Sequence, residues 1–128
     1  MTMNWSGVRP AITTCFQEDL TVDHEFVARH VGWLIENGCT GAFPKESVAL
    51  FEAAQKGETE RVLEIYRWSL PLLRMDTVPK FVQLIKLVQE EVGMGSARVR
   101  PPRLDVVGAE LAEARRIVAE ALANNPCK

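Results

Sequence analysis

The stretch NGCTGAFPKESVALF, residues 37–51, decides which kind of fold can follow. Before it, residues 8–16 (VRPAITTCF) are rich in β-branched and apolar side chains and predict a short buried strand. Residues 23–38 then place apolar side chains at helical spacing and predict an amphipathic helix. A second strand would complete a parallel βαβ unit, but Pro44 opens a new helix six residues after Gly38. The chain therefore begins like an α/β protein and continues as a helical one.

Helices are expected over most of the sequence. Apolar periodicity, with proline and glycine at the boundaries, predicts helices at 23–38, 44–57, 58–75, 77–93 and 109–124. Pro71 should bend or end the third of these near Ser69, because proline has no amide hydrogen to bond backwards. Residues 93–108 contain no clear element, and a connection of that length is usually functional or packed as an extended arm. The predicted fold class is mainly α: a single domain over residues 1–128, with a bundle of about five helices and one short N-terminal strand.

The predicted strand at 8–16 needs a hydrogen-bonding neighbour. Residues 39–43 (CTGAF) are the nearest candidate within the chain. Unpaired strand groups are costly when buried and favour association with another chain. We therefore expect residues 8–16 to contact a second subunit.

Two apolar stripes predict the core. Leu73 and Ile85 each occupy the centre of a stripe on consecutive helices, so both are expected in one core between an antiparallel helix pair. His30 also lies on an apolar stripe, where a hydrogen-bonded core histidine is favoured over a catalytic base.

None of the five lysines is expected to act as a nucleophile. A Schiff-base lysine must be neutral near pH 7, which requires burial or a cationic neighbour. Lys86 lies inside a helix, but Gln83, Gln89 and Glu90 around it indicate a polar, solvated face. Glu90 should also raise the pKa of Lys86.

Composition excludes several classes of protein. Apolar residues are 47% and charged residues 25%, which is typical of a folded globular chain. The net charge of −2, with basic residues spread among acids, argues against a nucleic-acid partner. Residues 97–103 (ARVRPPR) are locally basic, and pairing of these arginines with acidic groups is favoured over a phosphate site.

The three cysteines, Cys15, Cys39 and Cys127, are odd in number and widely spaced. They form no metal-binding pattern and are expected to be free thiols of a cytoplasmic protein. No window is apolar enough for a membrane span, so a membrane is not expected as a partner. Neither a metal nor another cofactor is expected either.

Two blocks of the sequence resemble the dihydrodipicolinate synthase and N-acetylneuraminate lyase family of Schiff-base aldolases and dehydratases. Residues 5–41 are similar to the family's first strand and helix, with Thr-Thr at the end of the strand and a Gly-x-x-Gly after the helix. Residues 42–126 are similar to its C-terminal helical part, through AFPKESVALFEAAQKGE, IYRWSLPLL, FVQLIKLVQEEVGMG and VRPPRL in this order. The family is a (β/α)₈ barrel, which typically needs about 250 residues.

The resemblance implies a barrel remnant in which the first βα unit, 1–41, is joined directly to the terminal helices, 42–128. It also implies that the family's Gly-Thr-Thr-Gly-Glu turn, its barrel tyrosine and its Schiff-base lysine are absent, so no catalytic residue is expected. Thr13 and Thr14 are the positions that match the family's substrate pocket, and Cys15 stands where the family has proline.

Three functions remain open from the sequence. The first is a self-associating helical domain without the family's catalysis, because amphipathic helices made to pack on a barrel need another apolar surface to cover. The second is a pyruvate-dependent lyase whose missing barrel comes from a longer chain or a partner. The third is a regulatory or scaffold partner of a full-length relative.

Overall fold

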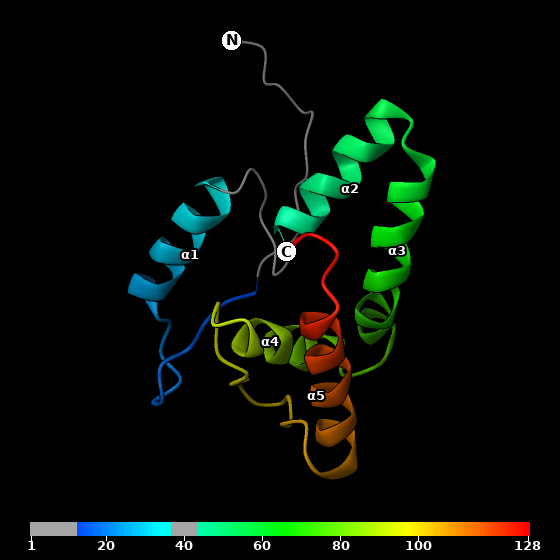
Figure 1. The fold of residues 1–128 in the computed structure, drawn as a ribbon. Coiled ribbons are helices and arrows are strands. Elements are labelled where there is room, and N and C mark those ends of the chain that lie inside the picture. Colours follow the sequence, from blue (N-terminus) through cyan, green and yellow to red (C-terminus); the bar gives the residue numbers. More distant parts are fainter. Residues whose placement is uncertain (1–12, 37–43) are drawn as a thin grey trace.

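The computed structural model describes residues 13–36 and 44–128, and within them the chain is mainly helical (Figure 1). The α-helices are α1 (His24–Glu36), α2 (Pro44–Lys56), α3 (Thr59–Arg74), α4 (Phe81–Glu91) and α5 (Gly108–Ala123), with a 3₁₀ turn η1 (Met75–Thr77). The predicted set of about five helices is therefore confirmed. The described residues contain neither a β-sheet nor a barrel.

The described part of the predicted strand is not a strand. Thr13 to Phe16 form no ladder, and the extended contact here is an isolated antiparallel bridge between Phe16 and Val22. This bridge closes a turn in which the Asp19 carboxylate accepts hydrogen bonds from the amide and hydroxyl of Thr21. The carbonyls of this segment accept hydrogen bonds from within the chain, from the Asp23 amide and from the side chains of Lys86 and Arg98, rather than from a neighbouring strand. Residues 8–12 and 39–43 lie outside the described residues, so pairing between them or across subunits stays a prediction.

The α2–α3 hairpin follows its sequence signals closely. Gly57 has a φ of 73°. The amides of Gly57 and Glu58 bond back to the carbonyls of Ala54 and Ala53, respectively, which ends α2 in a left-handed cap. The α3 helix then continues past Pro71 to Arg74, so the proline does not end it. Pro71 lies in the last turn, where the loss of one amide interrupts little of the remaining helix.

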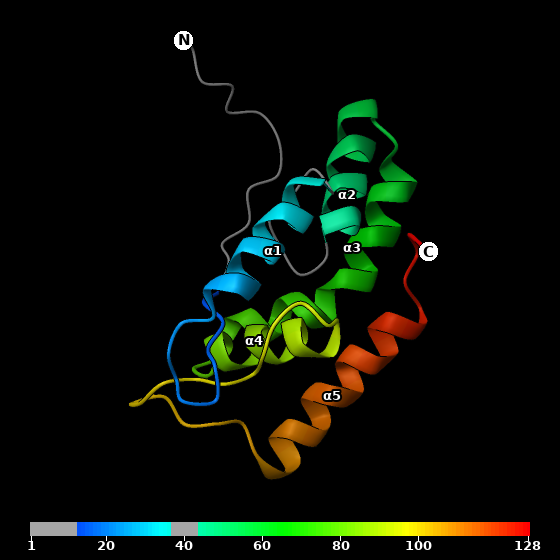
Figure 2. The ribbon, with the colours of Figure 1, turned by 90° about the vertical axis from the view of Figure 1, so that its left-hand side faces the viewer.

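The main core lies between η1, α4 and α5, and Figure 2 shows α4 crossing beside α5 at the base of α3. Its buried members are Met75, Leu84, Leu87, Val88, Ala114 and Val118. The prediction for Leu73 is wrong, because its side chain is 52% exposed while Leu72 packs against the core. Both faces of α3 carry leucines, and contact with α5 selects the face that contains Leu72.

The α4 helix is buried on two sides, which the sequence did not predict. Leu84, Leu87 and Val88 face the main core, and the expected polar face with Lys86 and Gln89 is buried as well. The segment 13–16 covers this second side. The helix predicted at 77–93 begins later, since α4 starts at Phe81 and ends at Glu91. The Thr77 hydroxyl donates to the Arg74 carbonyl.

None of the helices in the described ranges combines the length and the apolar character that a bilayer span needs.

Candidate functional site

Lys86 is the most unusual titratable residue of the described chain. It is only 2% exposed, its Nζ donates a 2.5 Å hydrogen bond to the Thr14 carbonyl, and the same atom lies 4.8 Å from the centre of the Phe16 ring. Burial lowers the pKa of Lys86, and the neighbouring Cys15 thiol opposes that shift. The predicted solvated lysine with a raised pKa is therefore wrong, because the segment 13–16 shields the amine from water.

Lys86 belongs to a pocket built from three segments that are distant in sequence. A cavity of about 320 Å³ lies between residues 13–16, α4 and residues 99–103. It is lined by Thr13, Thr14, Phe16, Val82, Lys86, Val99, Arg100, Pro101 and Arg103, which we call the basic pocket. Lys86 is its one buried lining residue, whereas both arginines are exposed at the mouth. Thr13 and Thr14, the positions expected from the family resemblance, lie here together.

The arginines of the basic loop have different partners. Arg98 pairs with Glu18 at 3.3 Å, as the sequence predicted for this loop. Arg100 instead donates from Nε to the Leu20 carbonyl at 2.7 Å, and its guanidinium lies 4.3 Å from the centre of the Phe16 ring. Within the described ranges, no side-chain hydrogen bond or ion pair is found for Arg103. Two of the three arginines therefore lack a carboxylate in direct contact.

A hydrogen bond behind the basic pocket holds residues 13–16 on α4. The Thr13 hydroxyl donates to Gln89 Oε1, and Cys15 is buried beside Lys86 with its pKa raised by desolvation. A side chain at Gly95 would place its Cβ 3.0 Å from the Cβ of Gln89 and 3.6 Å from Cys15 Sγ. Gly95 thus lets the chain after α4 pass close to the pocket wall, a role that periodicity alone could not reveal.

A second surface feature is an apolar stripe on the outer face of α3. Leu63, Tyr66 and Leu73 are 40, 45 and 52% exposed, and the half-buried Leu70 lies between them. This set of four residues is the α3 stripe. The opposite face of the helix holds the buried Ile65 and the Trp68 side chain, whose Nε1 donates to the Ala121 carbonyl at 2.8 Å.

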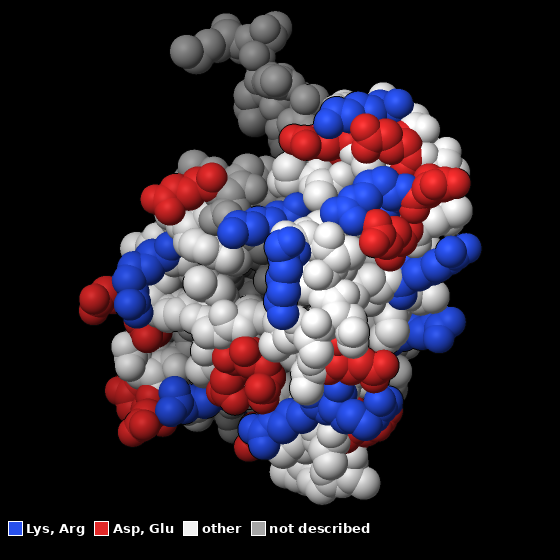
Figure 3. Space-filling view, in the orientation of Figure 1, with Lys and Arg blue, Asp and Glu red and all other residues white. Residues whose placement is uncertain are grey.

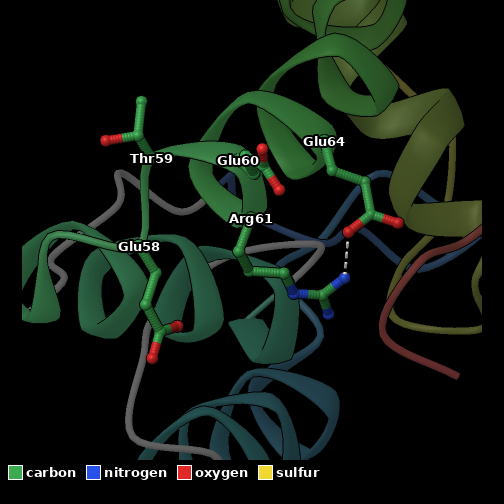
Figure 4. Close-up of a pocket in the computed structure, with 5 residues that line it drawn as sticks. All are labelled: Glu58, Thr59, Glu60, Arg61 and Glu64. Atoms are coloured by element: carbon green, nitrogen blue, oxygen red, sulfur yellow. Dashed lines mark hydrogen bonds and ion pairs between the residues drawn. The ribbon is translucent and has the colours of Figure 1, made fainter.

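Figure 3 shows acidic and basic side chains interspersed over the face in view. A hollow at the start of α3 is lined by Glu58, Thr59, Glu60, Arg61 and Glu64 (Figure 4). Its arginine is already engaged, since Arg61 Nη1 lies 2.5 Å from Glu64 and Nη2 donates to the Pro126 carbonyl at 3.0 Å. The Arg61 side chain therefore links α3 to the C-terminal segment.

His30 is buried as predicted, in contact with two aromatic side chains. It packs against Phe26 and Trp33, with ring centres 5.8 and 6.1 Å away. Its Nε2 atom has no hydrogen-bond partner among the described residues, and burial lowers its pKa. Cys15 and Cys127 are free thiols, whereas Cys39 lies outside the described residues.

Comparisons with models of protein families, with curated proteins and with solved structures found no match for this chain.

Proposed function

We propose that this chain acts as a self-associating helical domain, in which a second copy covers the α3 stripe. The observation that carries the proposal is the spacing of the stripe. Leu63, Tyr66, Leu70 and Leu73 follow each other at intervals of three, four and three residues, which is the a/d pattern of helices that pack in pairs. An exposed stripe of this kind on a globular chain marks an interaction surface.

The same spacing suits a two-fold contact between identical helices. Leu63 and Leu73 lie equally far from Trp68 along the chain, as do Tyr66 and Leu70. An antiparallel pair of α3 helices would therefore place Leu63 on the Leu73 of the second copy, and Tyr66 on its Leu70.

Charges beside the stripe support the antiparallel arrangement. Glu60, Arg67 and Arg74 recur at seven-residue intervals along one flank. In the antiparallel pair, Arg74 of each copy approaches Glu60 of the other, an attraction that occurs twice. The two Arg67 side chains flank the axis, where their length lets the guanidinium groups turn outward into water.

We also propose that the Schiff-base catalysis of the dihydrodipicolinate synthase family has been lost from this chain. The resemblance to that family supports this. That chemistry needs residues on several strands of one barrel. The described residues form five helices and no sheet. A truncated relative that keeps its helices retains apolar faces while losing the catalytic framework.

Sedimentation equilibrium of the full chain tests self-association. We expect a concentration-dependent mass that approaches twice 14.3 kDa. A compact monomer at all concentrations up to about 100 µM, corresponding to a free energy of association weaker than about 5.5 kcal/mol, would refute the proposal.

A Schiff-base lyase is the second candidate, and the lowered pKa of Lys86 favours it. Lysine nucleophiles act as neutral amines, so Lys86 is the position at which an imine with a 2-oxo acid is most readily formed. Incubation with pyruvate and borohydride, followed by intact mass analysis, separates the two candidates. Self-association without catalysis predicts an unchanged mass, whereas a reduced adduct on Lys86 would establish imine chemistry. Co-purification with a full-length relative would instead favour the regulatory role.

A further inference from the structure

We infer that the basic pocket is a binding site for a small organic anion, with the anionic group, a carboxylate or a phosphate, held by Lys86, Arg100 and Arg103. The inference does not depend on self-association, because the pocket and the α3 stripe lie on different helices. It does not require a carbonyl group on the ligand either.

The balance of charge in the pocket is the first argument. Three of its lining residues are cationic and none is acidic. Asp19 interacts electrostatically with Arg100, but its carboxylate already accepts two hydrogen bonds from Thr21. The pocket therefore presents a positive field with no carboxylate lining it.

The burial of Lys86 is the second argument. Its Nζ contacts a carbonyl oxygen and an aromatic ring, and no acidic side chain is among its partners. A buried ammonium without a counter-ion is costly, and an anion in the cavity would supply that counter-ion. The amine also has three donor positions, so its bond to the Thr14 carbonyl leaves others for a ligand.

The walls indicate the kind of anion. Arg100 and Arg103 stand three residues apart at the mouth. The Nε and Nη2 atoms of Arg100 already donate to the Leu20 carbonyl, so Arg100 offers a ligand its positive charge and its Nη1 group. The guanidinium of Arg103 is open to the forked geometry in which arginine binds carboxylate and phosphate oxygens. The Thr14 hydroxyl contributes a further hydrogen-bonding group, whereas that of Thr13 already donates to Gln89. The remaining wall is apolar, formed by Phe16, Val82, Val99 and Pro101. A volume of about 320 Å³ fits a small molecule with a short carbon skeleton rather than a polymer.

Isothermal titration calorimetry of the full chain with inorganic phosphate and with malonate tests the inference. Neither probe has a ketone or aldehyde carbonyl, so binding is separated from imine formation. We expect saturable binding of at least one probe with a Kd below about 10 mM. Binding of phosphate alone would assign a phosphate-bearing ligand, binding of malonate alone a carboxylate-bearing one, and binding of both the shared anion chemistry.

Two variants and a matched control locate the site. Arg103→Gln should weaken binding about tenfold, because it removes a charged hydrogen-bond donor. It should not disturb folding, since the residue is exposed. Lys86→Met, checked for folding by circular dichroism, should weaken binding at least as much. Arg116→Gln removes the same charge from the exposed surface of α5 and should leave the Kd within twofold. Absence of binding by both probes, or equal weakening by Arg103→Gln and Arg116→Gln, would overturn the inference.

Discussion

Leu73→Ala gives the sharpest test of the proposed association, because Leu73 is among the most exposed residues of the α3 stripe. Burying a whole leucine side chain contributes about 1.5–3 kcal/mol. Since Leu73 is already about half covered in the single chain, its remaining gain on association is about 1 kcal/mol. A two-fold dimer contains the residue twice, so the variant should lose about 2 kcal/mol, which corresponds to a roughly 30-fold higher dimer Kd.

Sedimentation equilibrium over a dilution series measures this Kd, and far-ultraviolet circular dichroism checks that the helices remain. Leu104→Ala is the matched control, because Leu104 is 76% exposed and lies outside the stripe. Its dimer Kd should stay within about twofold of the unmodified protein.

Two results would refute the reasoning about Leu73. Equal Kd changes in the Leu73 and Leu104 variants would show that the stripe is not the contact surface. A loss of about 2–5 kcal/mol in the unfolding free energy of the monomer would show instead that Leu73 lies in the core, as its helical spacing first suggested.

The remaining predictions concern buried residues. Leu87→Ala should lower the unfolding free energy by about 2–5 kcal/mol in urea titrations, because Leu87 is 2% exposed in the main core; a change below about 0.5 kcal/mol would contradict its placement. Burial lowers the pKa of His30, so as pH falls the unfolded chain binds a proton at this side chain before the folded chain does. The free energy of unfolding should therefore decrease as pH drops below about 6.5. His30→Phe should flatten that decrease, and an unchanged pH profile would contradict the burial of His30. The folded chain likewise releases the Lys86 proton at lower pH than the unfolded chain, so stability gains a contribution as pH rises toward 10.5. Urea titrations of Lys86→Met should lack this gain, and identical slopes would mean that Lys86 is not desolvated.

Local signals in the sequence located most of the helices. Pro44 starts α2 as expected. Gly57 separates α2 from α3 because glycine, which has no Cβ, adopts the left-handed conformation without strain. The predicted ranges 58–75 and 109–124 differ from α3 and α5 by a single residue at each end. Strand formation in 8–16 could not be judged in the same way, since a strand depends on a neighbour that its own residues do not specify.

The sequence by itself determined where helices form, because capping, periodicity and breaking residues act within a few positions of each other. Only the tertiary structure decided which faces became internal. Leu72 and Leu73 are equally apolar, and contact with the core partly buried the first and left the second exposed. Lys86 is polar by every local measure, yet the Thr14 carbonyl, 72 positions away, accepts its hydrogen bond inside the fold. Burial is a property of contacts between distant segments, and residues adjacent in sequence do not encode it.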